Sequence, residues 1–241
     1  MNQDLAFTLQ KYKPTYHPVV EIDAEKDKII PFDFTAANKE ISPELIADTT
    51  NFSAWVNEKL KTEKATFGIG GYNENRTLYS RSNLFAGVQA RTLHLGVDIW
   101  GVAGTPVHAP IGGMVHSFAF NDNFGDYGAT IILQHNLDTT SFYTLYGHLC
   151  LADLTEMRVG KFVTRGEEFA HFGEPQENGN WPPHLHFQVI EDIGLHMGDY
   201  PGVCTIKEAG KYLKNCPDAN LMLNLKNNFT QLEKPGQSDH V

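Results

Sequence analysis

The sequence is poor in cysteine and has no long apolar run. Its 241 residues include three cysteines, Cys150, Cys204 and Cys216, and none of them belongs to a CxxC pair. An odd number leaves at least one thiol unpaired, so we expect free thiols, with pairing or metal binding by Cys204 and Cys216 as the alternative. No stretch approaches the roughly 20 apolar residues that span a bilayer, so no transmembrane segment is expected.

Basic residues are also in deficit, with 19 Lys and Arg against 29 Asp and Glu, a formal net charge of −10. A nucleic-acid partner is therefore not expected, because phosphate binding requires a basic face. The N-terminus has no basic segment followed by an apolar run, as a secretory signal would. We therefore expect a cytoplasmic protein, or a periplasmic or cell-envelope protein if a leader has been removed.

Three parts are expected along the chain. Residues 1–64 are predicted to be an N-terminal helical appendage, with an extended start and two short helices. Ser42 before Pro43 marks the first helix start, and residues 52–60 repeat apolar side chains at helical spacing. Residues 65–192 are predicted to be the catalytic domain. Residues 193–241 are predicted to be a C-terminal extension with a short helix near 208–214 and a disordered tail from 231.

Short strands separated by glycine and proline dominate residues 91–191. The segments 129–135 and 141–149 are rich in β-formers and are joined by a hairpin-like connection. This spacing predicts a mainly β fold, an antiparallel sheet or sandwich. The glycine-rich stretch 66–76 is expected to be a loop. Polar and aromatic residues in and just after it are expected to line a cleft as substrate-binding residues: Tyr72, Asn73, Arg76 and Tyr79.

Two short alternating segments carry the chemistry. His94 and Asp98 share one face of the first segment, and His184 and His186 share one face of the second, together with Gln188. Two imidazoles and a carboxylate on rigid strands are suited to a divalent metal ion. Catalytic zinc sites keep three protein ligands and one open position, which His94, Asp98 and one histidine of the second segment would satisfy.

Hydrolysis of an amide requires further groups beside the metal. Zinc lowers the pKa of its bound water to about 7, and another group must take the proton while one stabilises the developing oxyanion. Two histidines remain for this work, His148 at the end of a strand and the unused histidine of the second segment. HxxxD and HxH are each weak motifs, and their combination in this order with His148 between them is much more specific.

Residues 91–191 resemble the lysostaphin-type (LytM-like) zinc endopeptidases, which cleave peptide cross-links of bacterial cell walls. The resemblance rests on short blocks: Arg91-x-x-His94-x-Gly96-x-Asp98, 104–115, Tyr146-Gly-His148-Leu, 159–166 and Pro183-His184-Leu-His186-Phe. It implies a small antiparallel β sheet, a duplicated hybrid motif, with the cleft on its concave face.

The resemblance also implies roles for five residues. His94, Asp98 and His186 would bind one Zn²⁺ per chain, and His148 and His184 would be the catalytic pair, with the division of labour between them left open. Some family members carry a tyrosine six positions before the first ligand. This chain has Val88 there, and Tyr72 or Tyr79 would have to substitute.

The expected function is a zinc metalloendopeptidase that hydrolyses peptide bonds in peptidoglycan peptides. One alternative is an intracellular amide or peptide hydrolase with a substrate other than the cell wall, which the missing leader motivates. Another is a non-catalytic, metal-binding regulatory module on the same fold. The scissile bond and the oligomeric state are left open.

Overall fold

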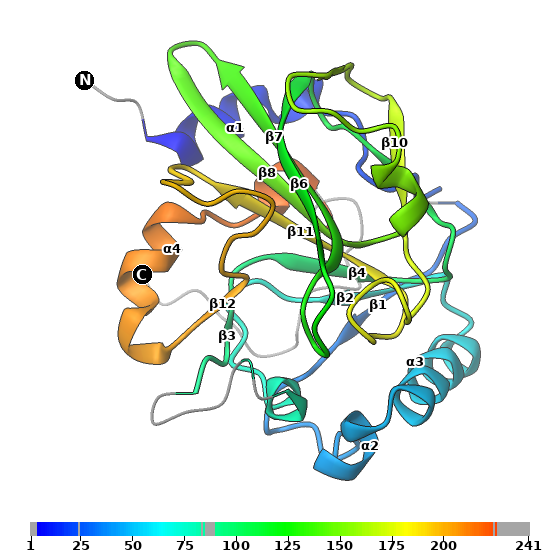
Figure 1. Ribbon diagram of the computed structural model, residues 1–241. Coiled ribbons are helices and arrows are strands. Elements are labelled where there is room, and N and C mark those ends of the chain that lie inside the picture. Colours follow the sequence, from blue (N-terminus) through cyan, green and yellow to red (C-terminus); the bar gives the residue numbers. More distant parts are fainter. Residues whose placement is uncertain (1–3, 24, 83, 85–89, 224, 226–241) are drawn as a thin grey trace.

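The computed structural model describes residues 4–23, 25–82, 84, 90–223 and 225, and its centre is one eight-stranded sheet (Figure 1). Across the sheet the strands are β1 (Ile29–Phe32), β2 (Phe67–Gly70), β4 (Val97–Trp100), β11 (His184–Ile190), β8 (Thr140–Leu149), β7 (Gly128–Leu137), β6 (Gly113–Asn121) and β9 (Phe162–Val163). All neighbours are antiparallel except β1 and β2. The prediction of a mainly β chain built on an antiparallel sheet is confirmed.

Two short sheets complete the β structure. In one, β10 (Glu168–His171) pairs with β5 (Pro106–His108), and in the other, β12 (Val203–Cys204) pairs with β3 (Leu93–His94). Single turns of 3-10 helix lie at Lys13–Thr15, Leu78–Arg81, Leu151–Leu154 and Ile206–Glu208. The β12–β3 pair matters for the site, because it ties a C-terminal segment to the first metal-ligand candidate.

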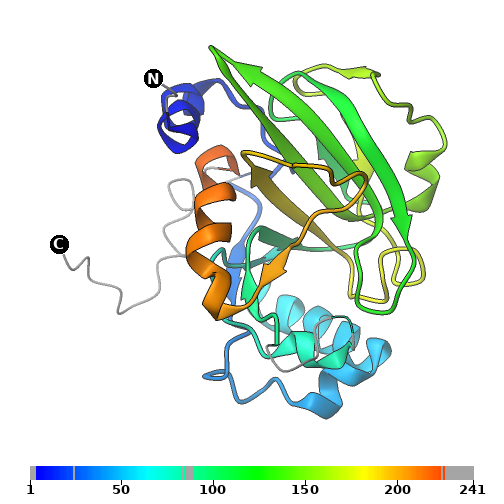
Figure 2. The same cartoon turned by 60° about the vertical axis from the view of Figure 1, so that its left-hand side comes forward.

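The α-helices are short and lie around the sheet: α1 (Leu5–Tyr12), α2 (Pro43–Ala47), α3 (Thr49–Glu63), α4 (Ala209–Asn215) and α5 (Asn220–Leu223). Ser42 caps α2 by accepting from the Leu45 amide at 3.2 Å, so the predicted helix start is confirmed. The prediction of an extended start was wrong for the residues of α1, which form a helix that Asp4 caps and in which Leu5 and Leu9 are buried. Figure 2 shows α1 beside α5, at the end of the described chain.

The glycine-rich stretch 66–76 begins with strand β2, so the prediction of a loop was wrong for residues 67–70. Its glycines are needed for close packing: a Cβ on Gly68 would lie 2.5 Å from the Phe32 ring, and one on Gly70 would lie 2.6 Å from the Arg76 guanidinium. β2 bridges β4 and β1, so a strand from the first 64 residues forms the edge of the large sheet.

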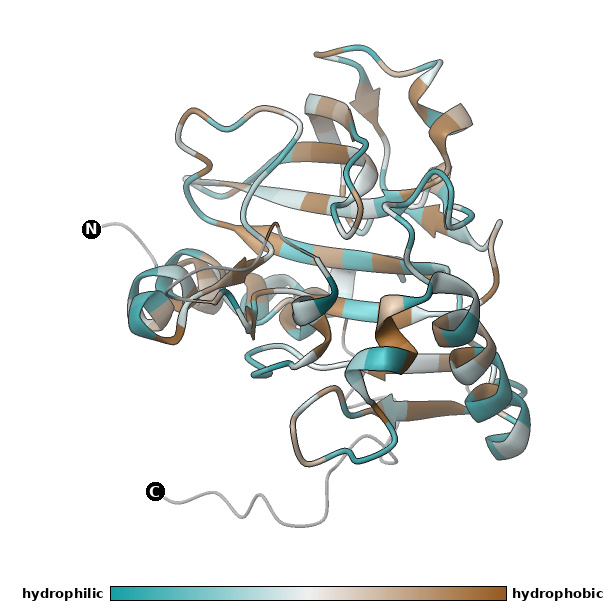
Figure 3. Ribbon diagram, turned by 60° about the horizontal axis from the view of Figure 1, so that its bottom comes forward, coloured by the Kyte–Doolittle hydropathy of each residue, from teal (hydrophilic) through white to brown (hydrophobic). Residues whose placement is uncertain are grey.

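Hydrophobic residues gather along the strands of the sheet, and hydrophilic residues mark the outer turns of the helices (Figure 3). On the face of the sheet that carries Trp100 and the site, α2 and α3 cover an aromatic cluster that includes Phe34, Phe52, Trp100 and Trp181. Because Trp100 and Trp181 also contact the site, this packing fixes the floor and one wall of the pocket.

Three further findings concern the chain as a whole. Cys150, Cys204 and Cys216 are free thiols, and the last two are buried. No helix in the described part of the chain is both long and apolar enough to cross a bilayer. The tail expected from residue 231 lies outside the described residues.

A buried histidine away from the site should make folding stability depend on pH. His135 on β7 is 1% exposed, its Nδ1–H donates to the Gly112 carbonyl at 3.0 Å, and its Nε2 lies 2.7 Å from Thr144 Oγ1. Burial lowers the pKa of His135 to about 4, so the neutral form is favoured on folding. The stability that this provides is complete above the unfolded pKa of about 6.5 and is lost as the pH falls toward 4, by about 3 kcal/mol.

Comparing urea unfolding of the wild type and His135→Gln between pH 7 and pH 4 isolates this contribution from those of other buried histidines. The variant should lose less stability across this window, by about the same 3 kcal/mol. Equal losses in the two proteins would contradict the expectation.

Candidate metal centre and catalytic pocket

Strand register brings the candidate residues of the two segments together. His186 on β11 lies directly opposite Asp98 on β4, and His184 lies opposite Trp100. Residues directly opposite in an antiparallel pair point to the same face of the sheet, about 5 Å apart. The alternation seen in the sequence therefore places Asp98, His184 and His186 on one face, as expected.

His94 reaches the same point from the separate strand β3. The segment 91–99 is expected to be one strand, but it breaks at Leu95 and Gly96, and β3 joins the β12 sheet while β4 joins the large one. Gly96 faces the site, since a Cβ there would lie 2.7 Å from the His186 ring. The space that the missing side chain of Gly96 leaves between His94 and Asp98 is thus filled by the His186 imidazole.

Three ligand atoms form a compact triangle. His94 Nε2 lies 3.2 Å from Asp98 Oδ1 and 3.0 Å from His186 Nδ1, and these last two atoms are 3.0 Å apart. Zinc–ligand distances of about 2.0–2.1 Å in tetrahedral geometry correspond to ligand–ligand distances of roughly 3.3–3.4 Å. The donor set and its spacing therefore fit zinc, and among the described residues this is the one group of three His, Cys, Asp or Glu side chains able to hold an ion.

The hydrogen bonds of His94 and His186 leave on each ring the nitrogen that faces the triangle without a proton, so that it could bind a metal ion. His94 Nδ1 lies 2.9 Å from the Gly71 carbonyl, which can only accept, so Nδ1 carries the proton and Nε2 has the lone pair. His186 Nε2 lies 3.0 Å from Gln188 Oε1, so Nε2 carries the proton and Nδ1 has the lone pair. Both lone pairs belong to the triangle, as metal ligation requires.

His148 and His184 form a second imidazole pair beside the triangle. Their ring centroids are 4.1 Å apart, and the His148 centroid is 6.3 Å from that of His186. The Nδ1–H of His148 donates to the backbone carbonyl of Asn178 at 2.8 Å, and the Nδ1–H of His184 donates to that of Pro182 at 2.8 Å. Each Nε2 therefore has a free lone pair and can accept a proton.

A local departure from regular strand geometry turns His148 toward the site. Gly147 lies opposite His186, so in a regular strand the next residue would point to the other face of the sheet. His148 instead has a φ of 63°, and the pairing of β7 with β8 shifts register between Ala129 and Ile131, next to it. Such left-handed backbone in a residue other than glycine costs energy and is often found at functional sites.

Burial favours the neutral forms of His94, His148 and His184. Burial lowers the pKa of His184 to about 4. Burial, and then the repulsion that a protonated His184 would exert, hold the pKa of His148 well below its ordinary value. Burial and then the Arg76 charge lower the pKa of His94 to about 4. For Asp98 burial acts in the opposite sense, since it raises the pKa, but His94 and Arg76 hold that pKa well below the usual range, so the side chain is anionic.

Arg76 is the main counter-charge of the site. Its Nη1 donates to Asp98 Oδ2 at 2.5 Å and to Tyr79 Oη at 3.2 Å, and its Nε donates to Glu74 Oε2 at 2.8 Å. The guanidinium is buried with both carboxylates. Because Arg76 occupies Oδ2, it leaves Oδ1 of Asp98 to the metal triangle. Glu74 was not singled out from the sequence, where a lone glutamate in a loop gives no signal.

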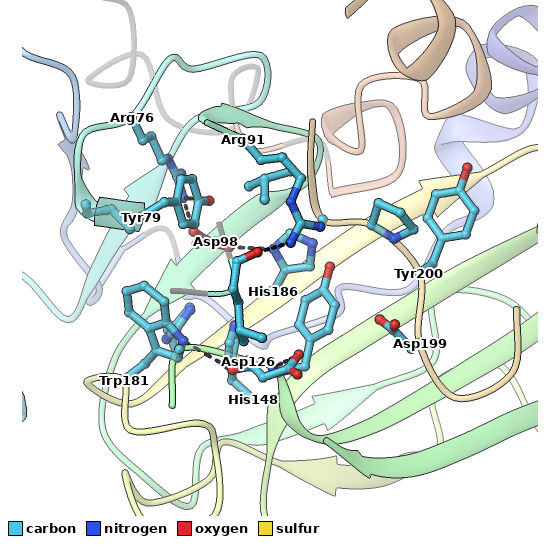
Figure 4. A pocket seen from close by; sticks show the side chains of 18 of the residues that line it. Arg76, Tyr79, Arg91, Asp98, Asp126, His148, Trp181, His186, Asp199 and Tyr200 are labelled. Atoms are coloured by element: carbon cyan, nitrogen blue, oxygen red, sulfur yellow. Dashed lines mark hydrogen bonds and ion pairs between the residues drawn. The ribbon is translucent and has the colours of Figure 1, made fainter. Parts of the chain in front are cut away.

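A pocket of about 220 Å³ opens over this arrangement, and Figure 4 shows His148, His186 and Asp98 facing it. Of the residues expected to bind substrate, Arg76 and Tyr79 line it. Tyr72 and Asn73 are not among its lining residues. The Tyr72 hydroxyl donates to the Cys216 carbonyl at 2.7 Å, and the backbone N–H of Asn73 donates to the backbone carbonyl of His94. Val88 lies outside the described residues.

The pocket also has walls that the sequence did not indicate. Trp100 stacks on His184 with centroids 3.9 Å apart and an interplanar angle of 9°. The Tyr127 ring lies 5.2 Å from His186 and 5.5 Å from His148. Trp181 and the segment 199–203 also line the pocket. These residues come from distant parts of the chain, so no local motif could have found them.

Comparison with solved structures finds partial likeness to several peptidases. The catalytic domain of lysostaphin from Staphylococcus simulans is 21% identical, with 68% of this chain and 98% of that chain covered and a TM-score of 0.38. A zinc-containing peptidase from Vibrio cholerae is 28% identical, with 49% and 31% covered and a TM-score of 0.36. A candidate M23 peptidase from Pseudomonas aeruginosa is 20% identical, with 54% and 43% covered and a TM-score of 0.36.

The chain thus spans less than half of the Vibrio and Pseudomonas structures. No curated protein matches the sequence at a significant level. A family model described as peptidase family M23 matches residues 92–196, a range that contains His94, Asp98, His148, His184 and His186. Residues 92–196 of this chain, which carry all five candidate site residues, thus match the model of peptidase family M23.

Proposed function

We propose that this chain is a zinc-dependent metalloendopeptidase, with one zinc ion per chain and with the peptides of peptidoglycan as its substrates. The observation that carries the proposal is the triangle of His94 Nε2, Asp98 Oδ1 and His186 Nδ1, set beside two further imidazoles with free Nε2 lone pairs. A non-catalytic metal-binding module would have no use for that second pair. The resemblance to lysostaphin-type enzymes supports the choice of substrate.

Zinc held by His94, Asp98 and His186 would supply a Lewis acid able to polarise a peptide carbonyl and a water molecule. The remaining work falls to His148 and His184. Because each Nδ1–H is committed to a backbone carbonyl, each Nε2 can take a proton and later return it to the leaving amine. Once protonated, the same Nε2–H can donate to the developing oxyanion.

The short distance between the two rings restricts how they share protons. With centroids 4.1 Å apart in a buried site, protonation of one imidazole disfavours protonation of the other. The pair is therefore suited to hold a single proton during turnover. Stacking of His184 on Trp100 fixes the plane of that ring, whereas the left-handed backbone fixes the direction of His148. Both features preorganise the pair.

Metal analysis and a peptide digest test the proposal together. Purified protein should contain about one zinc per chain, and it should cleave members of a peptide library in a reaction that a chelator stops and added zinc restores. A folded protein that contains well under one zinc after incubation with excess zinc would exclude the metalloenzyme.

The substrate is tested with intact peptidoglycan and soluble muropeptides beside unrelated peptides. Release of new amino termini from intact wall material is expected, and should be absent when the zinc-binding residue His94 is replaced by alanine. Cleavage of soluble peptides with no release from peptidoglycan would favour instead the hydrolase with a substrate other than the cell wall.

A further inference from the structure

A buried glutamine contacts His186 at the ring nitrogen that faces away from Asp98 and His94. Gln188 lies on β11, two residues after His186 and on the same face, and it is 0% exposed. Its Oε1 is 3.0 Å from His186 Nε2, while its Nε2 lies 3.2 Å from the Pro201 carbonyl and 3.3 Å from Cys216 Sγ.

These contacts determine which way the amide of Gln188 is oriented. The Pro201 carbonyl can only accept a hydrogen bond, so the NH₂ group of Gln188 must face it. The carbonyl oxygen of the same amide then faces His186 and can only accept from it. His186 must therefore carry its proton on Nε2, which leaves the Nδ1 lone pair beside Asp98 and His94.

We propose that Gln188 is a positioning residue that holds His186 in its metal-binding tautomer and orientation. The inference rests on the zinc site of the proposed function, but it concerns metal affinity rather than the reaction. Without Gln188 the imidazole would be free to carry its proton on Nδ1, the nitrogen that points into the triangle. The free energy of metal binding would then be less favourable, because binding would have to shift the proton of His186 to Nε2 and fix the orientation of its ring.

The groups that hold Gln188 lie beyond the part of the chain that matches the family model. That match ends at residue 196, whereas Pro201 and Cys216 follow it. The same C-terminal segment also pairs with the other ligand histidine, since Val203 of β12 lies opposite His94 of β3. Through Gln188 and β3, the segment 201–216 supports both imidazole ligands of the site.

Zinc affinity, measured by competition with a chromogenic chelator, tests the proposal. Gln188→Leu has a similar size but no hydrogen-bonding groups, and it should bind zinc about 10–100-fold more weakly, the usual effect of losing such a partner. Gln188→Glu keeps an acceptor for His186 and should retain most of the affinity. The matched control is Gln134→Leu, on β7 of the same sheet, where the side chain donates to Ser141 Oγ at 3.2 Å, and this variant should bind zinc as the wild type does.

Nitrogen-15 NMR of the histidine rings in metal-free protein provides the readout that a merely structural role would not change. In the wild type His186 should be the Nε2–H tautomer, and in Gln188→Leu the Nδ1–H tautomer should be populated. The proposal is overturned by an Nδ1–H tautomer in the wild type, by unchanged zinc affinity in Gln188→Leu, or by equal losses in Gln188→Leu and Gln188→Glu. The wild-type spectrum decides even if Gln188→Leu does not fold, and none of these readouts depends on peptidase activity.

Discussion

Replacing either histidine of the catalytic pair should separate zinc binding from turnover. His148→Asn and His184→Gln are each expected to retain about one zinc per chain and to lower kcat by about 10²–10⁴-fold, the usual effect of losing a general acid or base. Asparagine is chosen for position 148 because it tolerates the left-handed backbone there better than alanine does. Metal content and peptide cleavage are measured on the same preparations.

Two controls define the result. His94→Ala should lose zinc and activity together, because it removes a vertex of the triangle. His116→Ala changes a half-buried histidine on β6 whose Nδ1 lies 2.9 Å from Ser117 Oγ, and it should change neither. If a pair variant loses its zinc, the residue is a ligand rather than a catalytic group. Retention of near-normal turnover would rule out the proposed proton transfer.

Arg76→Met should cause a large loss of stability in the metal-free protein. The guanidinium pairs with both Asp98 and Glu74, which are 2% and 8% exposed, and methionine would leave these carboxylates without that cation. Breaking a buried ion pair by removing one partner costs about 3–5 kcal/mol. Urea unfolding measures the loss directly. Bound zinc would supply another cation to Asp98, so saturating zinc should recover part of the stability.

The matched control is Arg165→Met, since that arginine is exposed and its Nη1 donates to the Thr15 carbonyl at 2.8 Å. Surface changes of this kind are usually within about 0.5 kcal/mol of neutral. A loss in Arg76→Met no larger than that of the control would show that the buried network contributes little. The role of Arg76 would then have to be sought in substrate contacts, as first expected from its place near the cleft.

The candidate ligand residues could be proposed from the sequence because strand periodicity is local. Alternation places His184 and His186 on one face whatever the rest of the chain does, and the same holds for the face of β4 that carries Asp98. The helix start at Ser42 was also predictable, since a cap and a proline at the first helical position act within one turn.

Other features of the site could not be predicted because they depend on distant contacts. The alternation of β8 would turn His148 away from the site, and only the register shift against β7 together with the left-handed backbone brings it to His184. Arg76 was expected near substrate, but its partner Asp98 is 22 residues away along the chain. A loop residue's ion-pair partner is decided by packing, which no local pattern records.

The sequence by itself determined the candidate donors, His94, Asp98 and one of the histidines His184 and His186, and the mainly β class of the chain, whereas the choice of His186 and the pairing of His148 with His184 followed from the family resemblance. Residue type, strand alternation and motif order are local properties, so they survive without knowledge of the fold. The tertiary structure alone decided the tautomers of the imidazoles, the counter-charge of Arg76 and the support from Gln188. Each of these depends on a hydrogen-bond partner that only strand register and the folded flanking segments bring within about 3 Å.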